Sequence, residues 1–373
     1  MNGADRTVLL TGATGFVGME LLARYLERTD RRVVAIVRAA DDHAAGDRVD
    51  AVLANLFGYR AGRYGERVQA VAGELTAPRL GLSNLRWERL AGAVGTIVHG
   101  AASVSFGLPL TEARAINLEG TRRMLELAAR ARELGVLEHY AHISTAYVAG
   151  THAGRFFEHD LDVGQGFRNS YEQSKFEAEQ LVRSWPEMPF TIMRPSIVVG
   201  DRNSGWTAAF NVLYWPLRAL ARGIFPAVPA TPSSPVDVVS IDYVADAIHE
   251  LCERPGDTGQ TYHLTAGSDA STMGEIVNFA SGYFHRPGPK LVPPAEFAST
   301  ANGVAKTVLE EGSVYFPYFS VAATFDDAFT RARLEPAGIS VSPLRDYLGR
   351  LLDFATQARW GKKPIGRAEA LAA

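Results

Sequence analysis

Short apolar runs alternate with amphipathic stretches along the first half of the chain. The predicted strands cover residues 7–10, 33–37, 96–98, 139–144 and 190–193. The predicted helices cover residues 17–26, 119–134 and 170–185. Strands that are apolar throughout, and not only at alternate positions, indicate a parallel sheet covered by helices on both faces. The sequence therefore predicts a doubly wound α/β fold built on a parallel Rossmann sheet.

The pattern becomes less regular after residue 200. A polar loop at 201–205 precedes an aromatic segment that we expect to be helical. Its aromatic residues are Trp206, Phe210, Tyr214 and Trp215. Their spacing suits either packing of a helix or the lining of a substrate channel. The proline-rich segment 224–235 is expected to be irregular.

Strand and helix patterns then return and suggest a second, smaller lobe. The returning elements are predicted at residues 236–241, 243–253, 261–264 and 273–284. We predict that residues 1–200 form the cofactor-binding Rossmann domain, with 236–265 returning to it. Residues 201–235 and 266–366 are predicted to form a substrate-binding lobe, and residues 367–373 a frayed tail.

The composition excludes several classes of function. The 373 residues are 47% hydrophobic and 21% charged, and the formal net charge is −3. This balance gives no reason to expect a nucleic-acid partner. No run approaches the roughly 18 apolar residues of a membrane-spanning helix, and the lone Cys252 fits a buried small residue better than a metal site. We expect a cytoplasmic protein with no metal site.

A glycine-rich loop follows the first predicted strand and opens the first predicted helix. Gly12, Gly15 and Gly18 give the spacing G-x-x-G-x-x-G, one residue longer than the commonest dinucleotide fingerprint. Such glycines allow a tight turn, close approach to a diphosphate and close packing of helix on sheet. The predicted cofactor site also includes the loop residues Thr14, Phe16 and Val17.

Arg38 ends the second predicted strand, where an NAD-selective site usually carries an acid. An arginine there matches a 2′-phosphate, and Arg48 on the next predicted helix supplies a second donor. The sequence therefore favours NADPH. A pair of solvated arginines is the alternative, and the acids Asp41 and Asp42 lie close by in the sequence.

Further residues of the predicted cofactor site follow later strands. Glu74 and Leu75 follow one more expected strand, the third in chain order, which ends before residue 73, and they are expected near the adenine. Ala101 follows the fourth strand, at residues 96–98, and is expected near the ribose. Pro195 and Ile197 end the sixth strand and are expected to lie under the nicotinamide. The neighbouring His99 is expected to be a packed, hydrogen-bonded histidine.

Tyr171 and Lys175 lie four residues apart on one face of a predicted helix. A nearby ammonium favours a phenolate, so we expect Lys175 to lower the pKa of Tyr171 and to bind the nicotinamide ribose as well. Tyr171 then donates a proton to the developing alkoxide, and Thr145 adds a hydroxyl donor to the same oxygen. Ser144 is the competing hydroxyl.

With these motifs in place, the chain resembles the extended short-chain dehydrogenases/reductases, and within them the thioester-reductase and fatty-acyl-CoA-reductase (male-sterility-type) branch. The shared stretches include TGATGFVG, GELTAPRLGLS, HISTAYVAG, YEQSKFEAE and RPSIVVGD. The resemblance implies Thr145, Tyr171 and Lys175 as catalytic residues and Arg38 with Arg48 as a 2′-phosphate clamp. It also implies an acyl thioester substrate, reduced to an aldehyde or alcohol. Because no adenylation or carrier domain precedes residue 1, we expect a carrier protein or a free CoA ester to deliver it.

Three other functions use the same fold. The first is an NADP-dependent alcohol dehydrogenase or ketoreductase acting on a sterol-like or polyketide-like substrate. The second is a nucleotide-sugar epimerase or dehydratase, which Arg38 disfavours because such enzymes usually hold NAD. The third is a non-catalytic NADPH-binding regulator, against which Thr145, Tyr171 and Lys175 argue.

Overall fold

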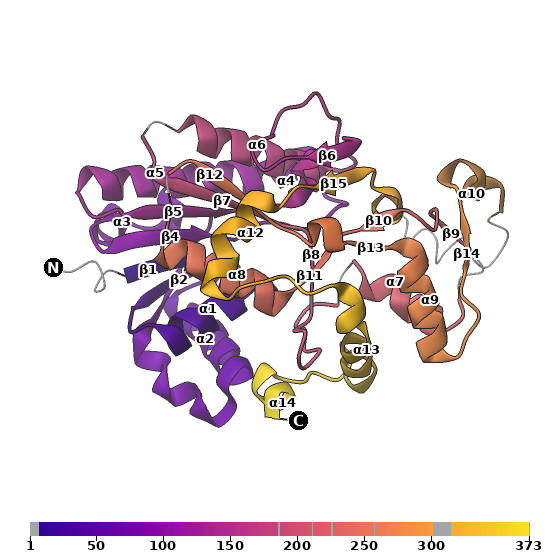
Figure 1. The fold of residues 1–373 in the computed structure, drawn as a ribbon. Coiled ribbons are helices and arrows are strands. Elements are labelled where there is room, and N and C mark those ends of the chain that lie inside the picture. Colours follow the sequence, from indigo (N-terminus) through magenta and orange to yellow (C-terminus); the bar gives the residue numbers. More distant parts are fainter. Residues whose placement is uncertain are drawn as a thin grey trace.

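A seven-stranded parallel sheet forms the centre of the molecule (Figure 1). The computed structural model describes residues 7–185, 187–210, 212–224, 227–256, 258–300 and 315–372. In spatial order the strands are β12 (Gln260–Leu264), β7 (Phe190–Pro195), β5 (His139–Ile143), β4 (Val94–His99), β1 (Thr7–Thr11), β2 (Val33–Val37) and β3 (Val68–Ala72). All neighbouring pairs are parallel. The predicted fold class is confirmed.

Helices cover both faces of this sheet. One layer consists of α1 (Phe16–Arg28), α2 (Asp42–Phe57) and α8 (Ile241–Glu253). The other consists of α3 (Asn84–Ala91), α5 (Gly120–Glu133) and α6 (Ser170–Ser184). In β1, Val8 and Leu10 join the first core and Leu9 joins the second. Burial on both faces explains why the strands are mostly apolar, and most of the polar residues that they do contain, such as His99, are themselves buried.

The strand order reverses beside β1, with β2 on one side and β4 on the other. In open α/β sheets such a reversal leaves a ligand-binding crevice at the carboxyl ends of the strands. The glycine loop follows β1 at this point. The short helix α4 (Leu110–Arg114) and a π-helical turn (Ala115–Glu119) lead from β4 into α5.

Short strand pairs and helices form a smaller lobe beside the sheet. The pairs are β6 (Gly154–Phe156) with β15 (Ala323–Phe325), β8 (Ile197–Val199) with β11 (Val238–Ser240), β9 (Ala227–Pro229) with β14 (Lys290–Val292), and β10 (Pro235–Val236) with β13 (Ser271–Thr272). The helices are α7 (Tyr214–Ala221), α9 (Met273–Phe284), α10 (Pro294–Thr300) and α13 (Leu348–Gln357). Leu217, Ile276 and Leu351 belong to a hydrophobic core of their own in this part. Helix α12 (Ala328–Leu334) instead packs against β12 of the central sheet. The division into domains stays a prediction.

The predicted aromatic helix after residue 205 is wrong in its first half. Trp206 and Phe210 precede α7, which begins at Tyr214. Pro216 is the third residue of α7, and a proline fits only the first turn because it has no N–H to donate. The indole of Trp206 instead donates to the carbonyl oxygen of Ile365 at 3.1 Å.

The proline-rich segment 224–235 is more regular than expected. Residues 225 and 226 lie outside the described part of the chain, but β9 forms at 227–229 and β10 begins at Pro235. Each of these strands pairs on one side only, with β14 and β13 respectively. Proline is tolerated there because an edge strand has N–H groups that the ladder does not use.

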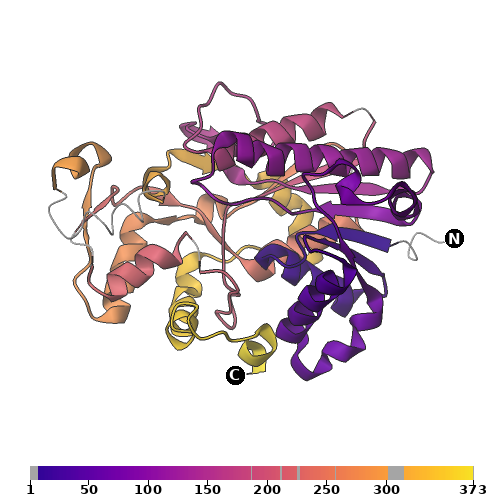
Figure 2. The same cartoon turned by 180° about the vertical axis from the view of Figure 1, so that it is seen from behind.

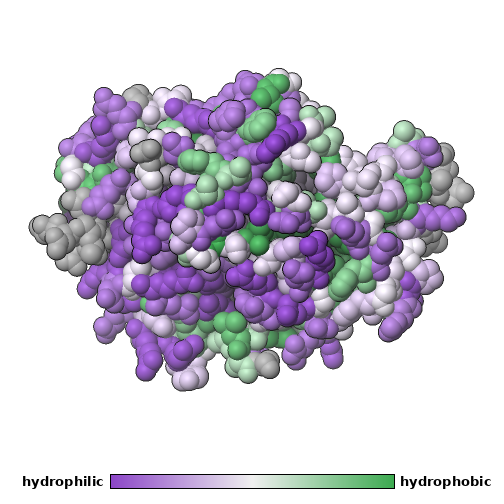
Figure 3. Space-filling view, in the orientation of Figure 1, coloured by the Kyte–Doolittle hydropathy of each residue, from purple (hydrophilic) through white to green (hydrophobic). Residues whose placement is uncertain are grey.

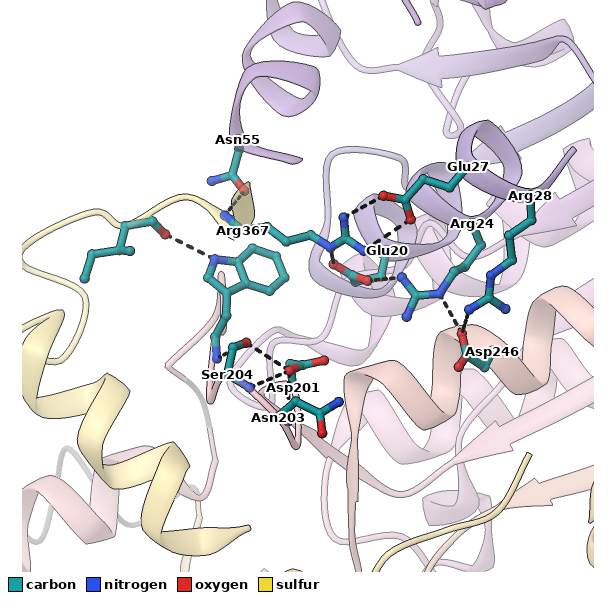
Figure 4. Close-up of polar contacts among 12 residues, drawn as sticks. Glu20, Arg24, Glu27, Arg28, Asn55, Asp201, Asn203, Ser204, Asp246 and Arg367 are labelled. Carbon is teal, nitrogen blue, oxygen red and sulfur yellow. Dashed lines mark hydrogen bonds and ion pairs between the residues drawn. The ribbon is translucent and has the colours of Figure 1, made fainter. Parts of the chain in front are cut away.

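The predicted frayed tail is a docked helix, α14 (Arg367–Ala372). Figures 1 and 2 show this helix beside α2 and away from the first residues of β1. The Arg367 guanidinium reaches α1, where it ion-pairs with Glu20 at 2.7 Å and Glu27 at 3.1 Å (Figure 4). Asn55 of α2 accepts a hydrogen bond from the Arg367 backbone at 3.3 Å. These contacts hold the described end of the chain on the sheet's helical layer.

Candidate active site

The glycine loop between β1 and α1 has the shape of a phosphate cradle. Gly12 has φ +80°, a left-handed conformation that favours glycine. A Cβ on Gly18 would stand 2.0 Å from the Gly12 carbonyl oxygen, so the helix can pack this closely only without a side chain. The Gly15 N–H donates to that same oxygen at 2.8 Å and closes the turn.

The start of α1 offers donors to an anion. Gly15 caps the helix, no side chain caps it, and its first turn carries no acid. The unpaired N–H groups and the helix dipole therefore face the loop. Phe16 and Val17 are half-buried at this point, and Thr14 lies beside them in the loop. The residues present thus fit a dinucleotide diphosphate.

Two arginines meet at the carboxyl end of β2. Arg48 of α2 donates to the Arg38 carbonyl oxygen and lies 3.3 Å from the Thr14 hydroxyl. The Arg38 side chain is exposed and forms no hydrogen bond or ion pair with another described residue. The nearby acids are engaged elsewhere: Asp41 caps α2, and Asp42 pairs with an arginine of α3 at 2.8 Å. Both arginines are therefore available to an incoming phosphate.

The remaining predicted cofactor residues border the same crevice. Glu74 and Leu75 follow β3, and the Glu74 N–H donates to the Leu80 carbonyl oxygen at 2.9 Å. Ala101 follows β4, and its N–H donates to the Thr11 hydroxyl at 3.1 Å. Their contacts with a cofactor stay a prediction.

His99 is packed, as the sequence indicated. Its ring nitrogens contact the hydroxyls of Thr11 at 2.8 Å and Thr121 at 3.2 Å. Burial, with a smaller effect from the charge of Lys175, lowers its pKa to about 3. A histidine held neutral in this way is a structural group at working pH.

Thr145, Tyr171 and Lys175 come together at the carboxyl ends of β5 and β7. Tyr171 is the second residue of α6, and Lys175 lies one turn further along. The Thr145 hydroxyl is near enough to Tyr171 to influence the pKa of its phenol, and it donates to the Pro195 carbonyl oxygen at 3.4 Å. The Lys175 amine donates to the Ile143 carbonyl oxygen at 2.7 Å.

The choice between the two neighbouring hydroxyls follows from their partners. Ser144 donates to the buried carboxylate of Glu179 at 2.8 Å. Thr145 faces Tyr171 instead. The geometry therefore favours Thr145 as the hydroxyl of the site.

The electrostatics of this group differ from the expectation. Burial raises the pKa of Tyr171 to about 12, and the neighbouring Thr145 hydroxyl opposes this rise. Burial also lowers the pKa of Lys175 to about 8. The lysine amine is directed at a backbone carbonyl, so the expected lowering of the Tyr171 pKa by Lys175 is wrong for the chain without cofactor. The phenol is held in its protonated form.

Several residues that the sequence did not single out support the site. Asn117, in the π-helical turn, is buried and donates to Ser174 of α6 at 2.9 Å. Phe106 lies against Tyr171, with ring centroids 5.7 Å apart, and stacks on Tyr318 at 4.8 Å. A π-helical turn is often found at functional sites, so the one that carries Asn117 is a usable signal. No local sequence signal connects Tyr318 with Tyr171, because the two are far apart in the chain.

The four aromatics after residue 205 serve packing. Trp206 lies against Phe16 with centroids 5.7 Å apart, and Phe210 stacks on Phe354 at 6.3 Å. The Tyr214 hydroxyl accepts from the Gly200 N–H at 3.0 Å. The ring of Trp215 lies 6.0 Å from a tyrosine ring. The packing interpretation accounts for the contacts of all four.

Among the described residues, no cluster of three His, Cys, Asp or Glu side chains could hold a metal ion. No described helix is long and apolar enough to span a membrane. The face drawn in Figure 3 is mostly hydrophilic, and its hydrophobic residues form small separate patches.

Known proteins share this arrangement. The NAD-binding family described as male sterility protein matches residues 10–248. An isonitrile lipopeptide synthase of Streptomyces coeruleorubidus is 37% identical over 269 residues, covering 70% of this chain and 18% of that protein. A carboxylic acid reductase of Mycobacterium marinum is 31% identical over 294 residues, covering 70% and 24%.

A solved structure is similar over its whole length. The terminal R domain from the myxalamid PKS-NRPS biosynthetic pathway matches with a TM-score of 0.84 at 28% identity, covering 98% of this chain and 94% of that one. This chain therefore spans less than a quarter of the two curated relatives but nearly all of an R domain. The predicted resemblance is confirmed.

Proposed function

Because this chain belongs to the male sterility protein family of NAD(P)-dependent reductases of the extended short-chain type, we propose that it reduces an acyl thioester to an aldehyde or alcohol. The proposed hydride donor is NADPH. The acyl group is carried on CoA or on the phosphopantetheine of a carrier protein. Similarity to a carboxylic acid reductase and to an R domain of a PKS-NRPS pathway supports this choice of substrate.

The main support within the chain is the meeting of Thr145, Tyr171 and Lys175 beside the glycine loop's crevice. The Thr145 and Tyr171 hydroxyls are neighbours, and in the proposed reaction one carbonyl oxygen accepts a hydrogen bond from each of them. The same strand ends lead to the segment Pro195–Ile197, proposed to lie under the nicotinamide. A hydride acceptor placed between these groups has a proton donor on its oxygen.

Each residue of the site has its own role in the proposed reaction. NADPH, when bound, supplies a hydride to the thioester carbonyl carbon. Tyr171 gives its proton to the carbonyl oxygen as the carbon–oxygen double bond becomes single, and Thr145 donates a hydrogen bond to the same oxygen. The carbon then carries a hydroxyl and a sulfur, and loss of the thiol leaves an aldehyde. Lys175 is proposed to bind the nicotinamide ribose and so to orient the hydride donor.

The selectivity for NADPH rests on Arg38 and Arg48. Arg48 is already oriented by the Arg38 carbonyl oxygen and Thr14, so it loses little freedom on binding. Arg38 presents a planar fork of donors suited to a phosphate. The engagement of Asp41 and Asp42 elsewhere supports this reading, because no free acid competes for the ribose.

The proposal is tested by NADPH oxidation with a panel of acyl-CoAs, acyl-carrier proteins, aldehydes and ketones. We expect thioesters to be consumed and an aldehyde or alcohol to appear. Tyr171→Phe removes only the hydroxyl, so turnover should fall at least 100-fold, the usual scale of general acid catalysis. NADPH binding, followed by its fluorescence, should stay within about twofold of wild type.

Two results would contradict this function. Oxidation of NADPH with ketones alone would favour the ketoreductase. A Tyr171→Phe variant with full thioester turnover would remove the phenol from the reaction.

A further inference from the structure

Tyr318 connects the smaller lobe with the residues around Tyr171. It lies in a 3₁₀ turn (Phe316–Ser320) that packs against β9 and β10 of that lobe. Its side chain is 3% exposed and belongs to the hydrophobic core of the lobe. Its ring and hydroxyl nevertheless contact three segments beside the central sheet, and each of these segments adjoins a residue of the proposed catalytic set.

The first segment is the loop between β4 and α4. Its Phe106 ring stacks on the Tyr318 ring, with centroids 4.8 Å apart and 19° between the ring planes. The other side of the contact is Tyr171, whose ring centroid lies 5.7 Å from that of Phe106. Two residues further on, the Leu108 carbonyl oxygen accepts a hydrogen bond from the Ser170 hydroxyl at 2.7 Å, which fixes the loop to the first turn of α6.

The second segment is the start of α6. The Tyr318 hydroxyl accepts a hydrogen bond at 2.8 Å from the side-chain amide of Asn169, the residue that caps α6. The side-chain oxygen of Asn169 accepts in turn from the Glu172 N–H at 3.0 Å. Because donor and acceptor are both engaged, the amide has one favoured orientation. A cap held in this way stabilises the first helical turn, which contains Tyr171.

The third segment is the turn after β5. The Tyr147 ring meets the Tyr318 ring nearly edge-on, with centroids 5.0 Å apart and 78° between the planes. The Tyr147 N–H donates to the Thr145 hydroxyl at 3.3 Å. The ring of Tyr318 therefore also supports the residue that orients Thr145.

From these three contacts we infer that Tyr318 is a positioning residue for the proposed proton transfer, which keeps the hydroxyls of Tyr171 and Thr145 directed at one carbonyl oxygen. The inference rests on the proposed function for the identity of that carbonyl compound. Tyr318 acts through its neighbours, and the proton comes from Tyr171. Because Tyr318 belongs to the smaller lobe, the placement of the proton donor depends on how that lobe packs against the sheet.

Tyr318→Ala removes all three contacts. Misplacement of a reacting group by about 1 Å can lower turnover roughly 100-fold, so we expect kcat to fall about 30- to 100-fold. The KM and the Kd for NADPH should change less than about threefold, because a loss confined to the chemical step leaves binding in place. The assay is NADPH oxidation with the acyl-CoA of the panel that wild type reduces fastest, or with the best ketone if wild type reduces only ketones.

Tyr347→Ala is the matched control. Tyr347 is 1% exposed and belongs to the same hydrophobic core, but it forms no hydrogen bond or ring contact with the described neighbours of Tyr318. Its loss should lower stability as Tyr318→Ala does, while kcat stays within about threefold of wild type. Tyr318→Leu and Tyr347→Leu give the same comparison if the alanine variants do not fold.

Tyr318→Phe separates the ring from the hydroxyl. It keeps the stack on Phe106 and the contact with Tyr147, and it loses only the acceptor for Asn169. We expect this variant to recover at least about tenfold of the kcat that Tyr318→Ala loses, because two of the three contacts remain.

Hydrogen exchange followed by mass spectrometry gives a readout that needs no turnover. The N–H groups of the first turn of α6, including that of Glu172, should exchange about fivefold faster in Tyr318→Ala than in Tyr347→Ala. The physical reason is that Asn169 loses its partner only in the first of these variants.

The positioning role and the proposed function fail in different ways. Equal kcat in the two alanine variants, or equal exchange at the start of α6, would overturn the positioning role. A raised KM with unchanged kcat would also overturn it, because Tyr318 would then act in substrate binding. A wild-type protein that reduces only ketones would overturn the thioester reaction, and the same variants would still test the role of Tyr318 with the ketone. If wild type reduces no compound of the panel, the exchange comparison decides.

Discussion

Arg194 lies at the centre of a buried polar network directly behind the proposed active site. Its guanidinium contacts the two carboxylate oxygens of Glu179 at 2.6 and 3.1 Å, and neither side chain is exposed to solvent. Glu179 also accepts from Ser144, the neighbour of Thr145, and Arg194 itself precedes Pro195. We predict that this pair supports both strand ends of the site, and replacing Arg194 with methionine tests it.

We expect Arg194→Met to lower the free energy of unfolding by about 3–5 kcal/mol, the usual cost of leaving one member of a buried ion pair alone. Burial raises the pKa of Glu179, but Arg194, with Arg183 and Ser144, outweighs burial and holds that pKa below its ordinary value. Arg183 remains 2.9 Å from the carboxylate after the substitution. The loss should therefore fall in the lower half of the range.

Urea unfolding followed by circular dichroism measures this loss. The double variant Arg194→Met/Glu179→Met removes both charges together and should recover more than half of it, because apolar replacements of a buried pair are often neutral. Arg130→Met is the matched control. Arg130 forms ion pairs with Glu88 and Glu133 on the surface, where such pairs contribute little, so the midpoint should not move measurably.

The pH dependence gives a second, independent test. Without Arg194, burial dominates and the pKa of Glu179 in the folded variant rises above its unfolded value. Stability from a group with a raised pKa is present below the unfolded pKa and is lost as pH rises through the folded pKa. Wild type behaves oppositely, because its lowered pKa gives stability that is lost on acidification. The deficit of the variant should therefore shrink as pH falls from neutral towards about 4.3, the ordinary pKa of glutamate.

Either of two results would refute this reasoning. A double variant as unstable as Arg194→Met would show that the lost stability does not come from an unpaired Glu179. A deficit that stays constant with pH would show that the carboxylate never takes up a proton.

Two further predictions concern the other arginines. Arg38→Asp should raise the Kd for NADPH at least 20-fold while changing that for NADH less than threefold. Arg32→Asp, at the opposite end of β2, is its control, and equal losses for both cofactors would remove the selectivity argument. Arg367→Ala should cost about 1–3 kcal/mol in urea unfolding, because Glu20 is buried and keeps only Arg24 as a partner. It should also speed hydrogen exchange in α14, and an unchanged exchange rate would contradict a docking role.

The central sheet and the glycine loop were predictable because their signals are local. Buried parallel strands are apolar at every position, and this pattern placed β2 at residues 33–37, as observed. The loop needs glycine at Gly12 and Gly18 for reasons that a few neighbouring residues impose. The Tyr171 and Lys175 pair follows from helical spacing alone.

The predictions that were wrong, and the site residues that were missed, concern features that depend on contacts between segments distant in the sequence. The sequence predicts a frayed tail at the end of the chain, but Arg367 forms an ion pair with Glu20, which lies more than three hundred residues away in the sequence. Tyr318 joins the site through Phe106 and Asn169, which no spacing rule connects with it. Only the start of α7 had a usable local signal, since Pro216 already limits where that helix can begin.

The pKa of Tyr171 shows how burial changes a conclusion drawn from spacing. A lysine one turn away on an exposed helix would favour the phenolate. Here Lys175 is buried and Tyr171 is half-buried, the amine is held by the Ile143 carbonyl oxygen, and the pKa of Tyr171 rises to about 12. A phenol that stays protonated cannot act as a base towards an alcohol at neutral pH, but it is ready to protonate an oxygen on which negative charge develops. The phenol is therefore already in the protonated form that the proposed reduction of a thioester requires of it.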